Sequence, residues 1–304
     1  MRKICILCPR ACAVDRTRRE RGICGQTWQI KAARAALHFW EEPCISGEKG
    51  SGAVFFSGCP LHCVYCQNQS IANGTAGELI SEERLAEIFL ELMEQGANNI
   101  NLVTPGHFAP QIIRAVEAAR RQGMYLPIVF NTSGYENVDT VKMLEGIVDI
   151  YLPDFKYMDS GLSGRYSHAP DYSRVAKAAL AEMVRQTGEA VFAGEPGDSL
   201  MKRGTIVRHL VLPGCIEDAK RVIRYLYETY GNAVYISIMS QFTPLPHTAA
   251  YPELNRRLLP EEYEAVVDYA VALGVENGFI QEGETAEESF IPAFDGEGVL
   301  RPGK

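Results

Sequence analysis

The sequence predicts an α/β fold in which parallel strands alternate with helices. Two observations predict it: short apolar runs rich in β-branched and aromatic residues recur through residues 51–281, and amphipathic stretches with helical spacing lie between them. The chain has 304 residues, 46% of them hydrophobic, so it can bury a large core. Repeated right-handed βα units build either a doubly wound sheet or a barrel, and this pattern alone does not choose between them.

The expected strands are brief and are spread along the whole middle of the chain. They are Ala53–Phe56, Asn99–Val103, Pro127–Asn131, Val148–Leu152, Ile206–Leu212, Ala233–Met239 and Gly278–Gln281. Ligands of such folds bind in the loops at the carboxyl ends of the strands. The conspicuous polar and cysteine residues follow these strands, which predicts the site there.

The clearest helix begins at Ser81, a residue type that caps helix N-termini well. It places Leu85, Ile88, Phe89 and Leu92 on one stripe. Further helices are expected through Ile112–Val116, Val175–Met183 and Val222–Leu226, and from Glu261 onward.

The chain divides into three zones. Residues 1–50 are a Cys-rich segment with weak periodicity, which suggests a metal-binding segment. Residues 51–281 carry the alternating strands and helices, and residues 282–304 are expected to form an irregular C-terminal tail.

Composition excludes several classes of protein. The net charge of −8 argues against a broad nucleic-acid surface. No stretch approaches the roughly 20 apolar residues of a membrane helix. The apolar run in the first residues, MRKICILCPR, is too short for a signal peptide. A cytoplasmic location is therefore expected, where disulfides are rare. Eight of the nine cysteines fall within the first 66 residues, which indicates metal ligation.

The segment AVFFSGCPLHCVYCQN contains the spacing Cys59-x3-Cys63-x2-Cys66 directly after the first expected strand. Thiolates select iron–sulfur clusters, and three of them leave one iron of a four-iron cluster without a protein ligand. Catalysis at a metal needs such an open position. A zinc site is the alternative, but His62 lies between two ligands and is poorly placed as the fourth.

With Tyr65 at the aromatic position, this segment resembles the C-x3-C-x-aromatic-C signature of the radical SAM superfamily. The resemblance implies a 4Fe-4S cluster whose open iron chelates S-adenosylmethionine. It also implies an oxidoreductase that cleaves this cofactor with one electron, from a reductant such as flavodoxin or ferredoxin, to methionine and a 5′-deoxyadenosyl radical. Cys59, Cys63, Cys66 and Lys156 would be the catalytic residues.

Further runs resemble a branch related to pyruvate formate-lyase-activating enzymes. They are EEPCISGEKGSGAVFFSGC, VTPGHFAPQI, FNTSGYE, YLPDFKY, VRHLVLPG and YPELNRRL. The resemblance implies a partial TIM barrel of about six βα units, (β/α)6. Where relatives carry a glycine-rich turn that binds the cofactor's amino group, this chain reads Thr104, Pro105, Gly106 and His107. The alternative for these four residues is an ordinary βα turn.

The resemblance also implies cofactor contacts after the later strands. Asn131, Thr132 and Ser133 would hold ribose hydroxyls or the carboxylate, or else cap a helix. Asp154 and Lys156 resemble a D-x-K motif whose lysine approaches the carboxylate of the cofactor. Arg208 and His209 fall within a strand, where a buried charge needs a partner, and are expected to line the barrel interior. His247 weakly matches a histidine near the cofactor, and for each histidine a structural role is the alternative.

A second set of cysteines, Cys5, Cys8, Cys12 and Cys24, provides four thiolates, which suits a closed site. Zinc and an auxiliary iron–sulfur cluster both fit, and we favour the cluster. The arginines around this set are expected to lie in a solvated loop; they are Arg10, Arg16, Arg18, Arg19 and Arg21. Cys44 and Cys215 are left over as buried thiols, although Cys215 follows a strand and could face the site.

Three functions remain open from the sequence. The first is hydrogen abstraction from a peptide or protein, such as a glycyl-radical partner. The second is the same radical chemistry on a small metabolite. The third is an iron–sulfur electron carrier that does not cleave the cofactor, which the altered turn at Thr104–His107 would allow.

Overall fold

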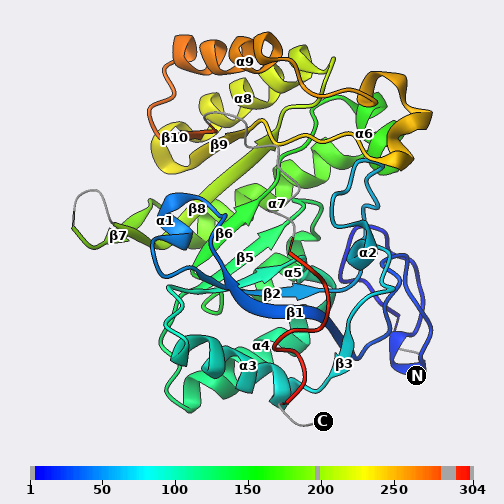
Figure 1. The fold of residues 1–304 in the computed structure, drawn as a ribbon, viewed down its shortest axis with the longest axis vertical. Coiled ribbons are helices and arrows are strands. Elements are labelled where there is room, and N and C mark those ends of the chain that lie inside the picture. The colour runs from blue at the N-terminus through cyan, green and yellow to red at the C-terminus, as the bar shows by residue number, and fades with distance from the viewer. Residues whose placement is uncertain (1–3, 196–198, 282–291, 302–304) are drawn as a thin grey trace.

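The computed structural model describes residues 4–195, 199–281 and 292–301, and it has the α/β architecture that the sequence predicts (Figure 1). One sheet runs in the order β10-β9-β8-β6-β5-β4-β2-β1-β3, and β7 pairs with β8 beside this path. The strands are β1 Ile30–His38, β2 Ser51–Phe56, β3 Glu78–Ile80, β4 Ile100–Val103, β5 Ile128–Thr132, β6 Ile150–Pro153, β7 Val191–Ala193, β8 Leu200–Leu210, β9 Tyr235–Met239 and β10 Gly278–Ile280. Among the described strands the path ends at β3 and β10 without closing, which confirms the partial barrel.

All seven predicted strands are present, and each pairs in parallel with its neighbour from β2 through to β10. The partial barrel therefore has one more parallel strand than the six expected from the family resemblance. Because parallel neighbours bring their carboxyl ends to one edge, the loops after β2, β4, β5, β6 and β8 meet there.

The sequence analysis did not find β1, β3 or β7. Strand β1 lies within the Cys-rich segment and pairs antiparallel with β2 and with β3. Its sequence, IKAARAALH, is rich in alanine and has a single β-branched residue, Ile30, whereas several such residues usually mark a strand. Strands β3 and β7 have three residues each, too few for a visible alternation. The first 50 residues thus contribute a strand to the same sheet as the βα units.

Helices cover the sheet (Figure 1), and the apolar side chains between them are buried. They are α1 Pro43–Ser46, α2 Gln69–Ala72, α3 Glu82–Glu94, α4 Ala109–Arg121, α5 Val138–Met143, α6 Ser160–Ser167, α7 Tyr172–Thr187, α8 Ile216–Tyr230 and α9 Pro260–Leu273. The predicted cap of α3 is confirmed, since the Ser81 side chain accepts a hydrogen bond from the backbone N–H of Arg84. The predicted stripe on α3 is buried in the largest core cluster. No helix in the described part of the chain is both long and apolar enough to cross a lipid bilayer.

The described part of the C-terminal zone, residues 292–301, contains neither helix nor strand but packs against the barrel. The backbone N–H of Ala35 in β1 donates to the carbonyl of Glu297 over 2.8 Å. The Arg84 side chain binds the carbonyl of Val299, whose own side chain is fully buried. Residues 282–291 and 302–304 of this zone lie outside the described residues.

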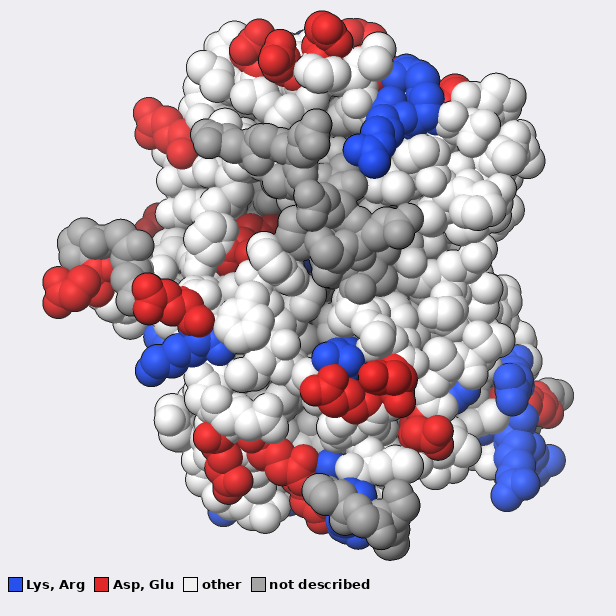
Figure 2. All heavy atoms as spheres, in the orientation of Figure 1, with Lys and Arg blue, Asp and Glu red and all other residues white. Residues whose placement is uncertain are grey.

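Charged side chains are interspersed on the surface. On the face drawn in Figure 2, acidic and basic groups occur in small clusters of both signs rather than as one broad basic surface. That distribution accords with the excess of acidic residues in the sequence.

Candidate cluster and cofactor site

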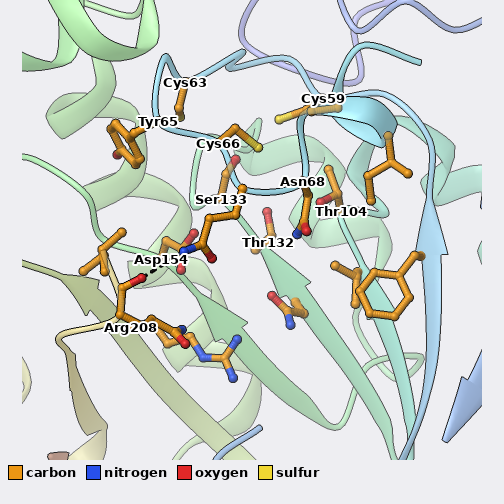
Figure 3. A pocket seen from close by; sticks show the side chains of 18 of the residues that line it. Cys59, Cys63, Tyr65, Cys66, Asn68, Thr104, Thr132, Ser133, Asp154 and Arg208 are labelled. Atoms are coloured by element: carbon orange, nitrogen blue, oxygen red, sulfur yellow. Dashed lines mark hydrogen bonds between the residues drawn. The ribbon is translucent and has the colours of Figure 1, made fainter. Parts of the chain in front are cut away.

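A cavity of about 270 Å³ opens at the carboxyl ends of the parallel strands. Predicted site residues from five different loops and strands lie around it (Figure 3). They are Cys59, Cys63, Tyr65, Cys66, Thr104, Asn131, Thr132, Ser133, Asp154, Lys156 and Arg208. The fold thus brings together residues that are up to 149 positions apart, from 59 to 208.

The three cysteines of the loop after β2 share one wall of this cavity (Figure 3). Burial raises the pKa of Cys59 to about 11 and that of Cys66 to about 12, and the neighbouring Cys63 adds to both shifts. Such thiols keep their protons at neutral pH unless a metal binds and displaces them. Three soft donors on a cavity wall fit a four-iron cluster with one iron accessible from the cavity.

The described residues hold no group of three His, Cys, Asp or Glu side chains close enough together to bind a single metal ion. A cube-shaped cluster instead takes each cysteine at a different iron.

Lys156 and Asp154 form an ion pair on the cavity wall, with 2.6 Å between Nζ and Oδ2. Burial alone would lower the pKa of Lys156, but Asp154 and Cys63 raise it well above its usual value. The ammonium group therefore stays charged beside the cysteine loop. Its Nζ also lies 6.0 Å from the centre of the Tyr65 ring, which is within reach of a cation–π contact.

The turn after β5 approaches the turn after β6 closely. Gly134 has a φ of +74°, and a Cβ at this position would overlap the backbone carbonyl of Asp154. Glycine is therefore required here, because any side chain would push apart the two turns that carry Ser133 and Lys156.

Arg208 has two acidic partners that the sequence analysis missed. Its guanidinium pairs with Glu41 and, at 2.6 Å, with Glu42 at the start of α1. Burial raises the pKa of Glu42, but Arg208 outweighs this effect and holds it below the usual value. The expected partner of the buried charge is thus present, and the arginine is neutralised rather than left for the cofactor carboxylate. The two adjacent glutamates at the start of the run EEPC are the sequence feature that could have predicted these partners.

The structure corrects the expectation for His209. Side chains alternate along a strand, so His209 points away from the face on which Arg208 lines the cavity. Its Nδ1 lies 2.8 Å from the carbonyl of Phe155, and burial lowers its pKa to about 4. His209 is thus a neutral, structural histidine.

The turn after β4 also differs from the expectation, because only Thr104 of the four predicted residues reaches the cavity. Pro105 and Gly106 turn away, and a Cβ on Gly106 would overlap the carboxylate of Glu136. The ring of His107 is buried, with Nε2 at 2.8 Å from the carbonyl of Ser57, and burial together with Arg16 lowers its pKa to about 3.

Thr104 itself has a φ of +57°, an unusual conformation for a β-branched residue. Such strain is commonly found at functional turns. His247 and Cys215 are not among the residues that line the cavity, and Cys215 is a partly buried thiol at the start of α8.

The N-terminal segment that carries the other four cysteines lies beside α2 in Figure 1 and contacts the cysteine loop, since Nε2 of His62 lies 2.8 Å from the carbonyl of Ile23. A Cβ on Gly22 would lie 3.3 Å from the Cys12 sulfur and 3.4 Å from the Cys24 sulfur. Burial raises the pKa of Cys8 to about 12 and also raises that of Cys24, and the other cysteines of the set contribute to both shifts. Cys12 and Cys24 thus lie near each other, although no three thiols of this set lie close enough together among the described residues to hold one metal ion.

Two arginines of this segment are not solvated, contrary to the expectation. Arg16 is 2% exposed and donates to the carbonyls of Thr27 and His107. Arg10 donates to the carbonyls of Pro60, in the cysteine loop, and of Ser167, at the end of α6. These side chains fasten the N-terminal segment to the barrel.

Residues 45–173 match the 4Fe-4S single cluster domain, a range that contains Cys59, Cys63 and Cys66. The chain is also 28% identical over 279 residues to an uncharacterized protein of Methanocaldococcus jannaschii, MJ0674, covering 88% of this chain and 74% of that protein. The domain match confirms the cluster type predicted from the spacing of the three cysteines.

Two solved structures resemble the fold. HydG, a maturase of the FeFe-hydrogenase, superimposes with a TM-score of 0.50 at 12% identity, covering 73% of this chain and 49% of that protein. SuiB of Streptococcus suis bound to S-adenosylmethionine gives a TM-score of 0.48 at 14% identity, covering 75% and 49%. The chain thus spans about half the length of either protein. The fold shared with HydG agrees with the α/β fold that the sequence predicts.

Proposed function

We propose that this chain is a radical SAM enzyme, which cleaves S-adenosylmethionine and abstracts a hydrogen atom from a peptide or protein substrate. The observation that carries the proposal is the wall of three cysteines, within the matched cluster domain, on a cavity at the carboxyl ends of parallel strands. The cluster, when bound, supplies one electron, so that a carbon–sulfur bond breaks and leaves methionine and a 5′-deoxyadenosyl radical. The radical becomes 5′-deoxyadenosine when it takes hydrogen from the substrate.

The cavity residues have distinct parts in this proposal. Lys156, held by Asp154, provides a fixed positive charge for the carboxylate of the cofactor. Asn131 and Ser133 provide short side chains that can form hydrogen bonds to the cofactor. Thr104 lines the cavity from a turn in which its φ is positive. Arg208 is already neutralised by its two glutamates, so its part is to hold α1 against β8.

The proposal includes a second metal at Cys5, Cys8, Cys12 and Cys24. Four thiols in one segment suit either zinc or an auxiliary iron–sulfur cluster, and we favour the cluster. All nine cysteines are free thiols in the structure, as a reducing compartment such as the cytoplasm requires. A flavodoxin or ferredoxin of that compartment would supply the electron.

The peptide or protein substrate rests on the resemblance of the runs around the site to activating enzymes. Fold alone does not determine a substrate. A small metabolite is the alternative, and the two differ in whether the hydrogen abstracted from a candidate protein appears in 5′-deoxyadenosine. Deuterated candidate proteins would deliver deuterium to that product.

The test is anaerobic. Protein loaded with iron and sulfide, reduced with dithionite and mixed with S-adenosylmethionine should yield 5′-deoxyadenosine and methionine by chromatography, and omission of the reductant should abolish both. Iron-loaded, reduced protein that binds the cofactor without cleaving it would favour the electron carrier. Zinc at the cysteine loop in place of iron would overturn the proposal.

A further inference from the structure

A row of hydroxyl groups leads from the cavity wall to one cysteine of the loop. The Tyr65 and Tyr157 hydroxyls are 2.6 Å apart, and the Tyr157 hydroxyl is 2.8 Å from that of Ser167. The Ser167 hydroxyl donates to the sulfur of Cys63 over 3.0 Å. All three hydroxyl-bearing residues are buried, with Ser167 fully so.

The direction of this row follows from proton counting. Cys63 as a cluster ligand is a thiolate, which accepts hydrogen bonds and has no proton to donate. Ser167 has a single hydroxyl proton and gives it to the sulfur, so it accepts from Tyr157, which in turn accepts from Tyr65. Each donor is polarised by the one before it, and the effect is stronger in a buried, low-dielectric setting.

The backbone around Ser167 is fixed from outside the barrel. The Arg10 side chain donates to the carbonyl of Ser167 over 3.1 Å and to that of Pro60 over 2.8 Å. It therefore joins the end of α6, which carries the donor, to the loop that carries the acceptor. The backbone N–H of Val64 also donates to the carbonyl of Tyr166 over 2.8 Å, so Arg10 and this hydrogen bond together fix the Ser167 hydroxyl relative to the Cys63 sulfur.

We propose that Ser167 sets the reduction potential of the cluster by donating this hydrogen bond to Cys63, with Tyr157 and Tyr65 strengthening it. An electron added to the cluster increases the negative charge on its sulfur ligands, and a hydrogen-bond donor stabilises that state more than the oxidised one. The row therefore raises the potential and makes the cluster easier to reduce. This inference rests on the proposed function, because it requires a cluster at Cys63, and it makes Ser167 a positioning residue that acts through a ligand.

The test is a reductive titration of iron-loaded protein, without S-adenosylmethionine, followed by electron paramagnetic resonance. Ser167→Ala removes the donor and should lower the potential of the one-electron couple by about 59 mV, a tenfold change in the equilibrium constant for reduction. Tyr157→Phe leaves Ser167 in place and should lower it by a smaller amount. Tyr65→Phe should have the smallest effect.

Ser163→Ala is the matched control. Ser163 lies in the same helix and is equally buried, but its hydroxyl donates to the carbonyl of Ser160, so the potential should stay at the wild-type value. A potential of Ser167→Ala equal to that of Ser163→Ala would overturn the inference, and so would an unchanged potential in Tyr157→Phe. A wild-type protein that takes up no iron at the loop would instead defeat the proposed function.

Discussion

The two sets of cysteines, three in the loop after β2 and four in the N-terminal segment, differ in their access to the cavity. Cys59, Cys63 and Cys66 line the cavity at the strand ends, whereas none of the four N-terminal cysteines is among the residues lining it. Burial raises the pKa of thiols in both sites, so protonation does not distinguish them. The two sets differ in the number of thiols and in the cavity, which lies beside the loop set alone, and these differences support the proposal of a reactive cluster at the loop and a closed metal site at the N-terminal set.

The neighbouring cations differ as well. The loop site faces the ammonium of Lys156, which is tied to Asp154 on the cavity wall. The N-terminal site has the buried Arg16 guanidinium, whose protons go mostly to backbone carbonyls. Lys156 is therefore placed where it can contact a ligand in the cavity, whereas Arg16 holds the backbone of the N-terminal segment in place.

The largest effect is expected from the loop site. Replacing Cys59, Cys63 and Cys66 together with alanine removes the thiolates of the catalytic cluster, so 5′-deoxyadenosine formation should fall to background. Iron and sulfide assays with chromatography of the product measure both losses. Cys215→Ala, a cysteine outside the cavity, should retain both, and product formed by the triple variant would contradict the assignment of the reactive site.

A partial loss is expected from the N-terminal site. Serine at Cys5, Cys8, Cys12 and Cys24 should remove about four irons per chain if a cluster binds there, or about one zinc if a zinc ion does. The electron paramagnetic resonance signal of the loop cluster should remain. Metal analysis of this variant beside Cys44→Ser gives the comparison, and unchanged metal content would mean that the four thiols bind nothing.

A smaller effect is expected at the cation of the cavity. Lys156→Met should weaken S-adenosylmethionine binding by about 10- to 100-fold, since a hydrogen bond to a charged group contributes about 1.5–3 kcal/mol. Titration calorimetry on cluster-loaded protein measures it. Lys177→Met is the matched control, because that lysine stacks on Tyr225 outside the cavity. Equal affinities of the two variants would remove Lys156 from the cofactor site.

The smallest effect concerns the junction between the N-terminal segment and the sheet, where His107 lies. Its pKa is about 3 when folded and about 6.5 when unfolded, so below pH 6.5 the unfolded chain binds a proton that the folded chain lacks. Stability should fall as the pH drops, by about 2 kcal/mol between pH 6.5 and 5 from this group. In His107→Gln, urea unfolding at both pH values should show a fall smaller by that amount. An unchanged pH dependence would place the histidine elsewhere.

Sequence patterns predicted all seven parallel strands because buried parallel strands are continuous apolar runs. Strand β1 was not predicted, because its alanines and charged residues do not form a continuous apolar run. Its pairing with β2 and β3 in the structure identifies it as a strand. Residue spacing likewise predicted the cysteine loop.

The detail of the site depends on contacts that spacing does not encode. His209 follows Arg208 directly, yet the alternation of a strand sends the two side chains to opposite faces. Glu41 and Glu42 lie more than 160 positions before the arginine they neutralise, at sequence separations of 167 and 166. Ser167 is a serine at a helix end, and only the fold brings its hydroxyl to Cys63.

The contacts of Arg10 also limit the order in which the protein is assembled. Its carbonyl partners at Pro60 and Ser167 lie 50 and 157 residues further along the chain. During translation the cysteine loop leaves the ribosome long before α6 exists, and contacts of such long range form late in folding. Iron insertion that needs the finished loop must therefore wait until the chain has been synthesised through α6.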